Sequence, residues 1–140
     1  MASAMPAMNR FGILGFRAAL IAYWPALFTA THYPKLELGG SIHVSDKVLH
    51  AVAFGLLAFF YWMFRRTLRR PISATFLPRA LIVLILYAAL DEFLQQFVNR
   101  TTDFYDWLAD VAGISAVLLA LELHRRLAQR GDARSATTDD

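Results

Sequence analysis

Carboxylate, amide and histidine side chains are concentrated where two apolar runs of the chain meet. Residues 91–113 hold five of the eleven acidic residues, together with glutamine, asparagine and arginine. Such groups bind cations, exchange protons and hydrogen bond to polar ligands. A charged side chain that faces lipid costs about 2.5–3.5 kcal/mol at the centre of a span, so polar residues between apolar runs face a bundle interior or water. This segment is therefore the first candidate for a functional site.

Helical spacing sorts these side chains into three stripes, each on one helix face. The stripes comprise Glu92, Gln95, Gln96 and Asn99; Asp103, Asp106, Asp110 and Gly113; and, at the start of an earlier apolar run, Asp46 and His50. Only a short link separates the first two stripes. We therefore expect two antiparallel helices whose polar stripes face each other, with the third stripe entering from the same side.

The carboxylates of this cluster outnumber the cations that could pair with them. Arg100 is the expected partner of Glu92 or of one of the aspartates, because a guanidinium group binds a carboxylate through two hydrogen bonds. Lys47, next to Asp46, is the second available cation, and His50 is a third when it is protonated. The cluster therefore carries a negative excess.

Three functions fit this polar cluster. The leading hypothesis is an outward-facing pocket that binds a cell-wall precursor, a lipid head group or an envelope protein. The second is an intramembrane enzyme acting on a lipid-linked substrate, with His50 as general base oriented by Asp46, and Glu92 or Asp106 as acid. The third is a structural or assembly subunit whose polar residues join helices through hydrogen bonds, with Gly113 allowing close approach. No known hydrolase motif favours the second.

The positions of the histidines and arginines argue against a metal site and against nucleic-acid binding. One histidine in the cluster, without a second at ligand spacing, does not predict a metal site, and the chain has no cysteine. No metal and no cofactor are therefore expected. His32, His43 and His124 are expected at interfaces or in loops. The arginines of residues 65–79 belong to no soluble nucleic-acid-binding module, so anionic membrane lipid is their expected partner and nucleic acid is not. No oligomeric state is predicted.

The apolar runs that must position the cluster predict an all-α membrane bundle. Apolar residues make up 57% of the 140 residues and the mean hydropathy is +0.41, whereas about 45–50% apolar residues is usual in soluble proteins. A hydrocarbon core of about 30 Å needs about 20 helical residues. Transmembrane helices are predicted at residues 11–31, 48–64, 80–98 and 104–123, and Pro25 is expected to kink the first.

These spans divide the chain and predict its orientation. Residues 1–10 form an N-terminal segment, residues 11–125 the membrane domain and residues 126–140 a polar tail that is expected to be disordered. With four spans, eleven of the fourteen basic residues fall on the side of both termini. The excess of arginine marks the cytoplasmic side. A multi-pass protein of the bacterial inner membrane is expected, with both termini inside and the polar cluster on the outer side.

The polar residues, taken together, resemble the VanZ-like family of small bacterial membrane proteins. The family motifs are Asp-Lys-x-x-His, matched by residues 46–50; Glu-x-x-Gln, matched by 92–95; Arg-x-x-Asp-x-x-Asp, matched by 100–106; and a later glycine, matched by Gly113. The family usually has asparagine where this chain has Asp110. The resemblance covers about residues 12–123. It implies an envelope role linked to resistance to the glycopeptide teicoplanin, through reduced antibiotic binding.

Overall fold

Four long helices make up the part of the chain that the structure, a computed structural model, describes: residues 8–33, 45–68, 71–98 and 102–136. They are α1 (Arg10–His32), α2 (Asp46–Thr67), α3 (Phe76–Gln95), which a short 3-10 helix η1 (Gln96–Val98) prolongs, and α4 (Phe104–Ala136). Each is long and apolar enough to cross a membrane. The predicted all-α fold with four membrane spans is confirmed, and the chain is a multi-pass membrane protein.

The first helix begins at a side-chain cap and continues through a proline. The Asn9 side chain accepts a hydrogen bond from the Gly12 backbone N–H at 2.8 Å, which satisfies one of the free donors of the first turn. α1 is helical on both sides of Pro25. It ends at His32, a residue that was expected at an interface or in a loop.

The third and fourth helices are longer than their apolar runs. α3 begins at Phe76 and includes Pro78 in its first turn, where the missing backbone N–H of proline has no helical partner to lose. α4 continues to Ala136, although the predicted span ends at residue 123 and a tail was expected from residue 126. The Glu122 carboxylate accepts hydrogen bonds from Arg125 at 2.7 Å and Arg126 at 2.6 Å. Pairs at these spacings stabilise a helix beyond its apolar part.

Helices α2 and α4 form the closest contact of the bundle, because small residues face each other there. A Cβ added at Gly113 would lie 2.7 Å from the Ala51 carbonyl carbon and would overlap the Ala51 carbonyl oxygen. One added at Gly55 would lie 3.3 Å from the Gly113 oxygen. Close approach through small residues is how helices associate in lipid, where the hydrophobic effect between helices is weak.

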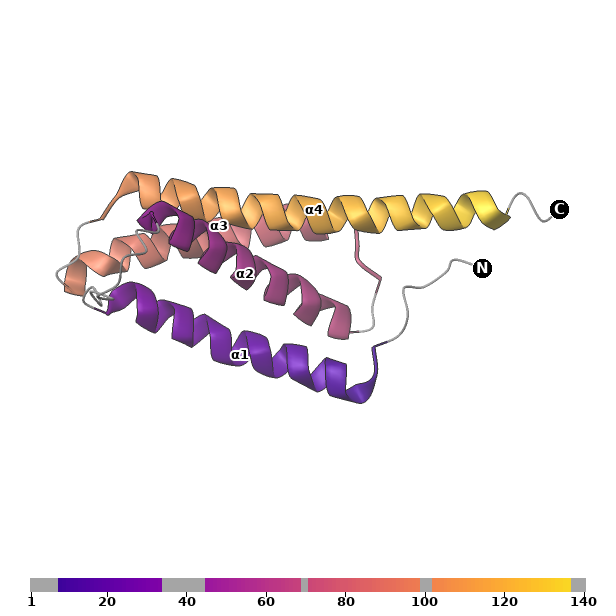
Figure 1. The fold of residues 1–140 in the computed structure, drawn as a ribbon, viewed down its shortest axis with the longest axis horizontal. Helices are drawn as coiled ribbons and strands as arrows, with labels where there is room; N and C mark the ends of the chain where they lie inside the picture. The colour runs from indigo at the N-terminus through magenta and orange to yellow at the C-terminus, as the bar shows by residue number, and fades with distance from the viewer. Residues whose placement is uncertain (1–7, 34–44, 69–70, 99–101, 137–140) are drawn as a thin grey trace.

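The buried core runs between α2, α3 and α4, whereas α1 lies at the edge of the bundle (Figure 1). Its fully buried members include Phe54 and Leu57 of α2, Leu84 of α3, and Ile114 and Leu118 of α4. α1 buries few side chains, and its Tyr23 hydroxyl donates to the Ala53 carbonyl oxygen at 2.9 Å. Large apolar side chains on the outer faces are exposed, as expected of surfaces that contact lipid: Phe11, Ile21, Val52, Leu86 and Leu119.

Candidate functional site

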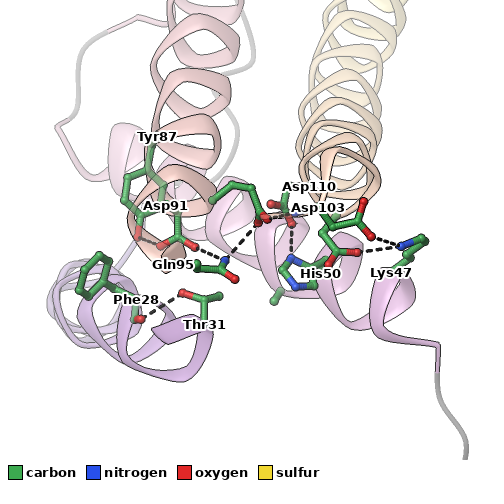
Figure 2. A network of polar contacts seen from close by, with 12 residues as sticks. Phe28, Thr31, Lys47, His50, Tyr87, Asp91, Gln95, Asp103 and Asp110 are labelled. Carbon is green, nitrogen blue, oxygen red and sulfur yellow. Dashed lines mark hydrogen bonds and ion pairs between the residues drawn. The ribbon is translucent and has the colours of Figure 1, made fainter. Parts of the chain in front are cut away.

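Polar side chains from all four helices meet at one end of the bundle (Figure 2). That end holds the C-terminal parts of α1 and α3 and the N-terminal parts of α2 and α4, while Arg10 and Ala136 lie at the other end (Figure 1). The predicted convergence of the stripes on α2, α3 and α4 is therefore present. The polar residues on or next to α2, α3 and α4 at this end are called the polar end site: Lys47, His50, Glu92, Gln95, Asp103, Asp106, Asp110 and, at its edge, Asp46.

His50 and Asp110 form a buried pair between α2 and α4. The His50 Nδ1 atom lies 3.0 Å from Asp110 Oδ1, and the two side chains are only 7% and 1% exposed. Figure 2 shows the two side chains pointing toward each other. Asp110 is thus the carboxylate that orients the imidazole ring, a role that sequence analysis assigned to Asp46. The carboxylate that this chain has at position 110, where the family usually has asparagine, is thus paired with His50.

Lys47 joins the outer edge of the site to α4. Its ammonium nitrogen lies 3.1 Å from Asp103 Oδ2 and 3.0 Å from Asp106 Oδ1. Asp103 also caps α4, because its Oδ1 accepts the Tyr105 backbone N–H at 2.8 Å. That hydrogen bond, with a further contribution from Lys47, lowers the pKa of the Asp103 carboxyl below its ordinary value. Asp103 thus links the start of α4 to Lys47 on α2.

Glu92 ties the end of α3 to the start of α4. One carboxylate oxygen accepts the Asp103 backbone N–H, and the other accepts the Gln95 side-chain N–H at 3.2 Å. A carboxylate at the N-terminus of a helix is stabilised by the free N–H groups and the helix dipole. Arg100, the predicted partner of Glu92, lies outside the described residues, as does Asn99. Gln95 is buried as predicted, but Gln96 is exposed and donates to the Phe93 carbonyl oxygen at 2.6 Å.

Asp91 is a further buried carboxylate that was not among the predicted site residues. It is 1% exposed and accepts hydrogen bonds from the Tyr87 hydroxyl and the Gln95 amide, each at 3.4 Å. The His32 Nδ1 atom lies 3.8 Å from Asp91 Oδ1, so a histidine that was expected at an interface or in a loop faces the bundle. The spacing of Tyr87, Asp91 and Gln95, four residues apart, was a signal for this stripe.

A cavity of about 210 Å³ opens between α1 and α2 beside the site. Its lining includes Leu27, Ala30, Thr31, Asp46, Leu49, His50, Ala53 and Phe54. Most of this wall is apolar, and the polar groups lie at one edge. Such a cavity fits a ligand that is polar at one end and apolar along the rest.

The charges of the site differ from those of an ordinary anion-binding pocket. Five carboxylates lie within the polar end site, and Lys47 is its one lysine or arginine among the described residues. Asp46, His50 and Asp106 each offer an oxygen or nitrogen atom within 4.8 Å of the other two. A histidine and two carboxylates offer nitrogen and oxygen atoms that can bind a divalent cation. The structure thus places together three possible ligands where no metal was expected.

Comparison with known proteins found a family and a relative that each match most of the chain. The family model described as VanZ/LLP1 matches residues 7–125. An uncharacterised protein of the fission yeast Schizosaccharomyces pombe is 31% identical over 126 residues, which cover 87% of this chain and 73% of the yeast protein. No solved structure matches the chain.

Proposed function

Because the chain belongs to the VanZ/LLP1 family and has four membrane-spanning helices, we propose that it is a cell-envelope protein that binds the phosphate-bearing head group of a membrane lipid. The observation that carries this proposal is the position of the polar end site beside a cavity with an apolar wall. The head group would contact Lys47 and His50, and the lipid chain would lie along α1 and α2. The proposed ligand is a polyprenyl phosphate, a lipid that carries cell-wall precursors.

Two further observations support this ligand class. Charged residues that are costly to place in a membrane face inward here, and such residues mark ligand and ion sites in membrane proteins. The yeast relative supports a ligand common to bacterial and fungal membranes, such as a polyprenyl phosphate, over a peptide specific to the bacterial wall. A protein that holds such a carrier would alter the supply of wall precursor, which is how we relate the site to teicoplanin resistance.

The binding experiment uses the full chain in phosphatidylcholine nanodiscs that contain a small fraction of polyprenyl phosphate. Native mass spectrometry then measures how much polyprenyl phosphate the protein retains. Lys47→Ala is expected to weaken retention about tenfold, because a hydrogen bond to a charged group contributes about 1.5–3 kcal/mol and 1.4 kcal/mol is a factor of ten.

Arg130→Ala is the matched control, since it removes an exposed cation at the opposite end of α4. It should leave retention unchanged. Equal retention by the two variants would show that the lipid binds elsewhere, and no retention by the unaltered protein would refute the proposal.

We further propose that the polar end site faces the outside of the bacterial inner membrane. The described arginines lie on the parts of the helices away from the site: Arg10, Arg17, Arg65, Arg66, Arg79, Arg125, Arg126, Arg130 and Arg134. Arginine is retained on the cytoplasmic side of membrane proteins. Both chain ends are then cytoplasmic, and the site is accessible to envelope components.

This orientation predicts which positions a membrane-impermeant maleimide reaches. The chain has no cysteine, so single cysteines report without background. In intact spheroplasts, Thr102→Cys, at an exposed position two residues before α4, should be labelled, and Arg130→Cys only after the membrane is permeabilised. The reverse pattern would place the site in the cytoplasm and remove cell-wall precursors on the outer face from the proposal.

A further inference from the structure

Three groups from two helices converge at the outer edge of the polar end site. Asp46 and His50 lie four residues apart, on one face of the first turns of α2, and Asp106 lies on the facing part of α4. One ligand atom from each lies within 4.8 Å of the other two. His50 and Asp106 are buried and Asp46 is exposed, so the group has rigid inner members and one member that water reaches.

The environment of His50 is that of a metal ligand. Histidines that bind metal ions commonly donate their other ring N–H to a carboxylate, which fixes the tautomer and the orientation of the ring. Here His50 Nδ1 lies 3.0 Å from the buried Asp110 carboxylate. With the proton held on Nδ1, the lone pair of Nε2 is free for a ligand. Asp110 would thus orient the histidine without itself contacting the metal ion.

The local charge balance also favours a cation. The carboxylates of Asp46, Asp106 and Asp110 surround His50, while Lys47 neutralises only part of this charge and contacts one oxygen of Asp106 at 3.0 Å. Among the described residues, no hydrogen bond to the other oxygen of Asp106 is formed, so that oxygen is available to a further partner. Asp46 and His50 also line the cavity of about 210 Å³. That volume accommodates the water or phosphate oxygen atoms that complete the coordination of a divalent ion.

We propose that Asp46, His50 and Asp106 bind a divalent transition-metal ion, Mn²⁺ or Zn²⁺, with Asp110 orienting the histidine. Imidazole favours transition metals over Mg²⁺ and Ca²⁺, and carboxylates are compatible with Mn²⁺ and Zn²⁺. A bound cation explains how a site with excess carboxylates receives a phosphate, because the ion bridges the protein and the phosphate oxygens. This bridging role rests on the proposed function, whereas ion binding itself does not.

The test measures ion binding without any phosphate carrier. The full chain, freed of metal with a chelator and placed in phosphatidylcholine nanodiscs, is titrated with Mn²⁺ while electron paramagnetic resonance records the free ion. One Mn²⁺ per chain is expected, and Zn²⁺ should displace it while Mg²⁺ and Ca²⁺ at equal concentration should not. Asp46→Asn and Asp106→Asn are expected to weaken binding on the order of tenfold to a hundredfold.

Asp103→Asn is the matched control, because Asp103 also contacts Lys47 but is not one of the three converging groups. It should leave Mn²⁺ binding within about threefold of the unaltered protein, since distant charges contribute weakly near water. Asp46 is exposed, so Asp46→Asn keeps the fold even if Asp106→Asn does not, and circular dichroism verifies this. Equal weakening by Asp103→Asn and Asp46→Asn would overturn the assigned ligands.

The result separates this inference from the proposed function. If the protein retains polyprenyl phosphate but does not bind Mn²⁺ or Zn²⁺, the metal site is refuted and the head-group proposal stands. If the ion binds and no polyprenyl phosphate is retained, the metal site stands and the head-group proposal falls. If both bind, treatment with a chelator should lower lipid retention, and unchanged retention would refute the bridging role of the ion.

Discussion

Gly113→Ala is expected to lower the free energy of unfolding more than an alanine at any other described glycine. The added Cβ overlaps the Ala51 carbonyl oxygen, which belongs to the backbone of α2 and cannot rotate away. The two helices must move apart, and overpacking of this kind costs about 1–3 kcal/mol or more. The loss is enlarged because close contact, rather than the hydrophobic effect, holds helices together in lipid.

The other glycines form a graded set of controls. At Gly55 the added atom would lie 3.3 Å from the Gly113 oxygen and from a Val117 methyl group, so a smaller loss is expected. At Gly15 and Gly131 nothing lies within 4 Å, and alanine there should stabilise the helix by about 0.5–1 kcal/mol. Thermal unfolding in detergent, followed by circular dichroism, ranks the four variants. A Gly113→Ala protein as stable as Gly131→Ala would contradict the contact between α2 and α4.

His50→Leu and Asp110→Leu are each expected to destabilise the protein strongly, and the double variant to recover part of the loss. Each single change leaves a buried polar partner without its hydrogen bond, at positions 7% and 1% exposed. Breaking a buried pair costs about 3–5 kcal/mol, whereas replacing both members by apolar residues is often neutral. Ordinary hydrogen bonds between membrane helices contribute only about 0.6 kcal/mol on average. A larger loss is expected here, because each single change leaves a polar group buried without its partner.

A double-mutant cycle measured by unfolding in detergent gives the coupling energy of this pair. The comparison pair is Lys47 with Asp103, which are 48% and 40% exposed. Exposed ion pairs contribute about 0–1 kcal/mol, so Lys47→Met should hardly change stability. A coupling energy for His50 and Asp110 no larger than that of the exposed pair would show that burial does not strengthen their interaction.

The sequence was sufficient to predict the four spans but not their ends. Apolar length alone decides whether a segment crosses a membrane, and all four runs pass that test. The ends depend on local contacts that hydropathy does not report. Pro78 is compatible with a first turn, and the pairs of Glu122 with Arg125 and Arg126 help α4 continue beyond its apolar part.

The candidate site was predictable where helix geometry is regular. Asp106, Asp110 and Gly113 face α2, as their spacing on one helix indicated. Gln96 was wrongly placed in the buried stripe: regular α-helical spacing stops at Gln95, and Gln96 begins the 3-10 helix with its side chain exposed. His32 could not be assigned to the bundle from sequence, since its approach to Asp91 depends on how α1 lies against α3.

The close contact of Gly113 with Ala51 also fixes the positions of the polar residues beside it. Ala51 follows His50 directly, and Gly113 lies one turn beyond Asp110. Backbone contact at that point fixes both the spacing and the axial register of α2 and α4, and with them the 3.0 Å separation of the His50 and Asp110 side chains. A larger residue at this contact would disturb the geometry of the site before it unfolds the protein. The geometry of the polar end site therefore depends on having glycine at position 113.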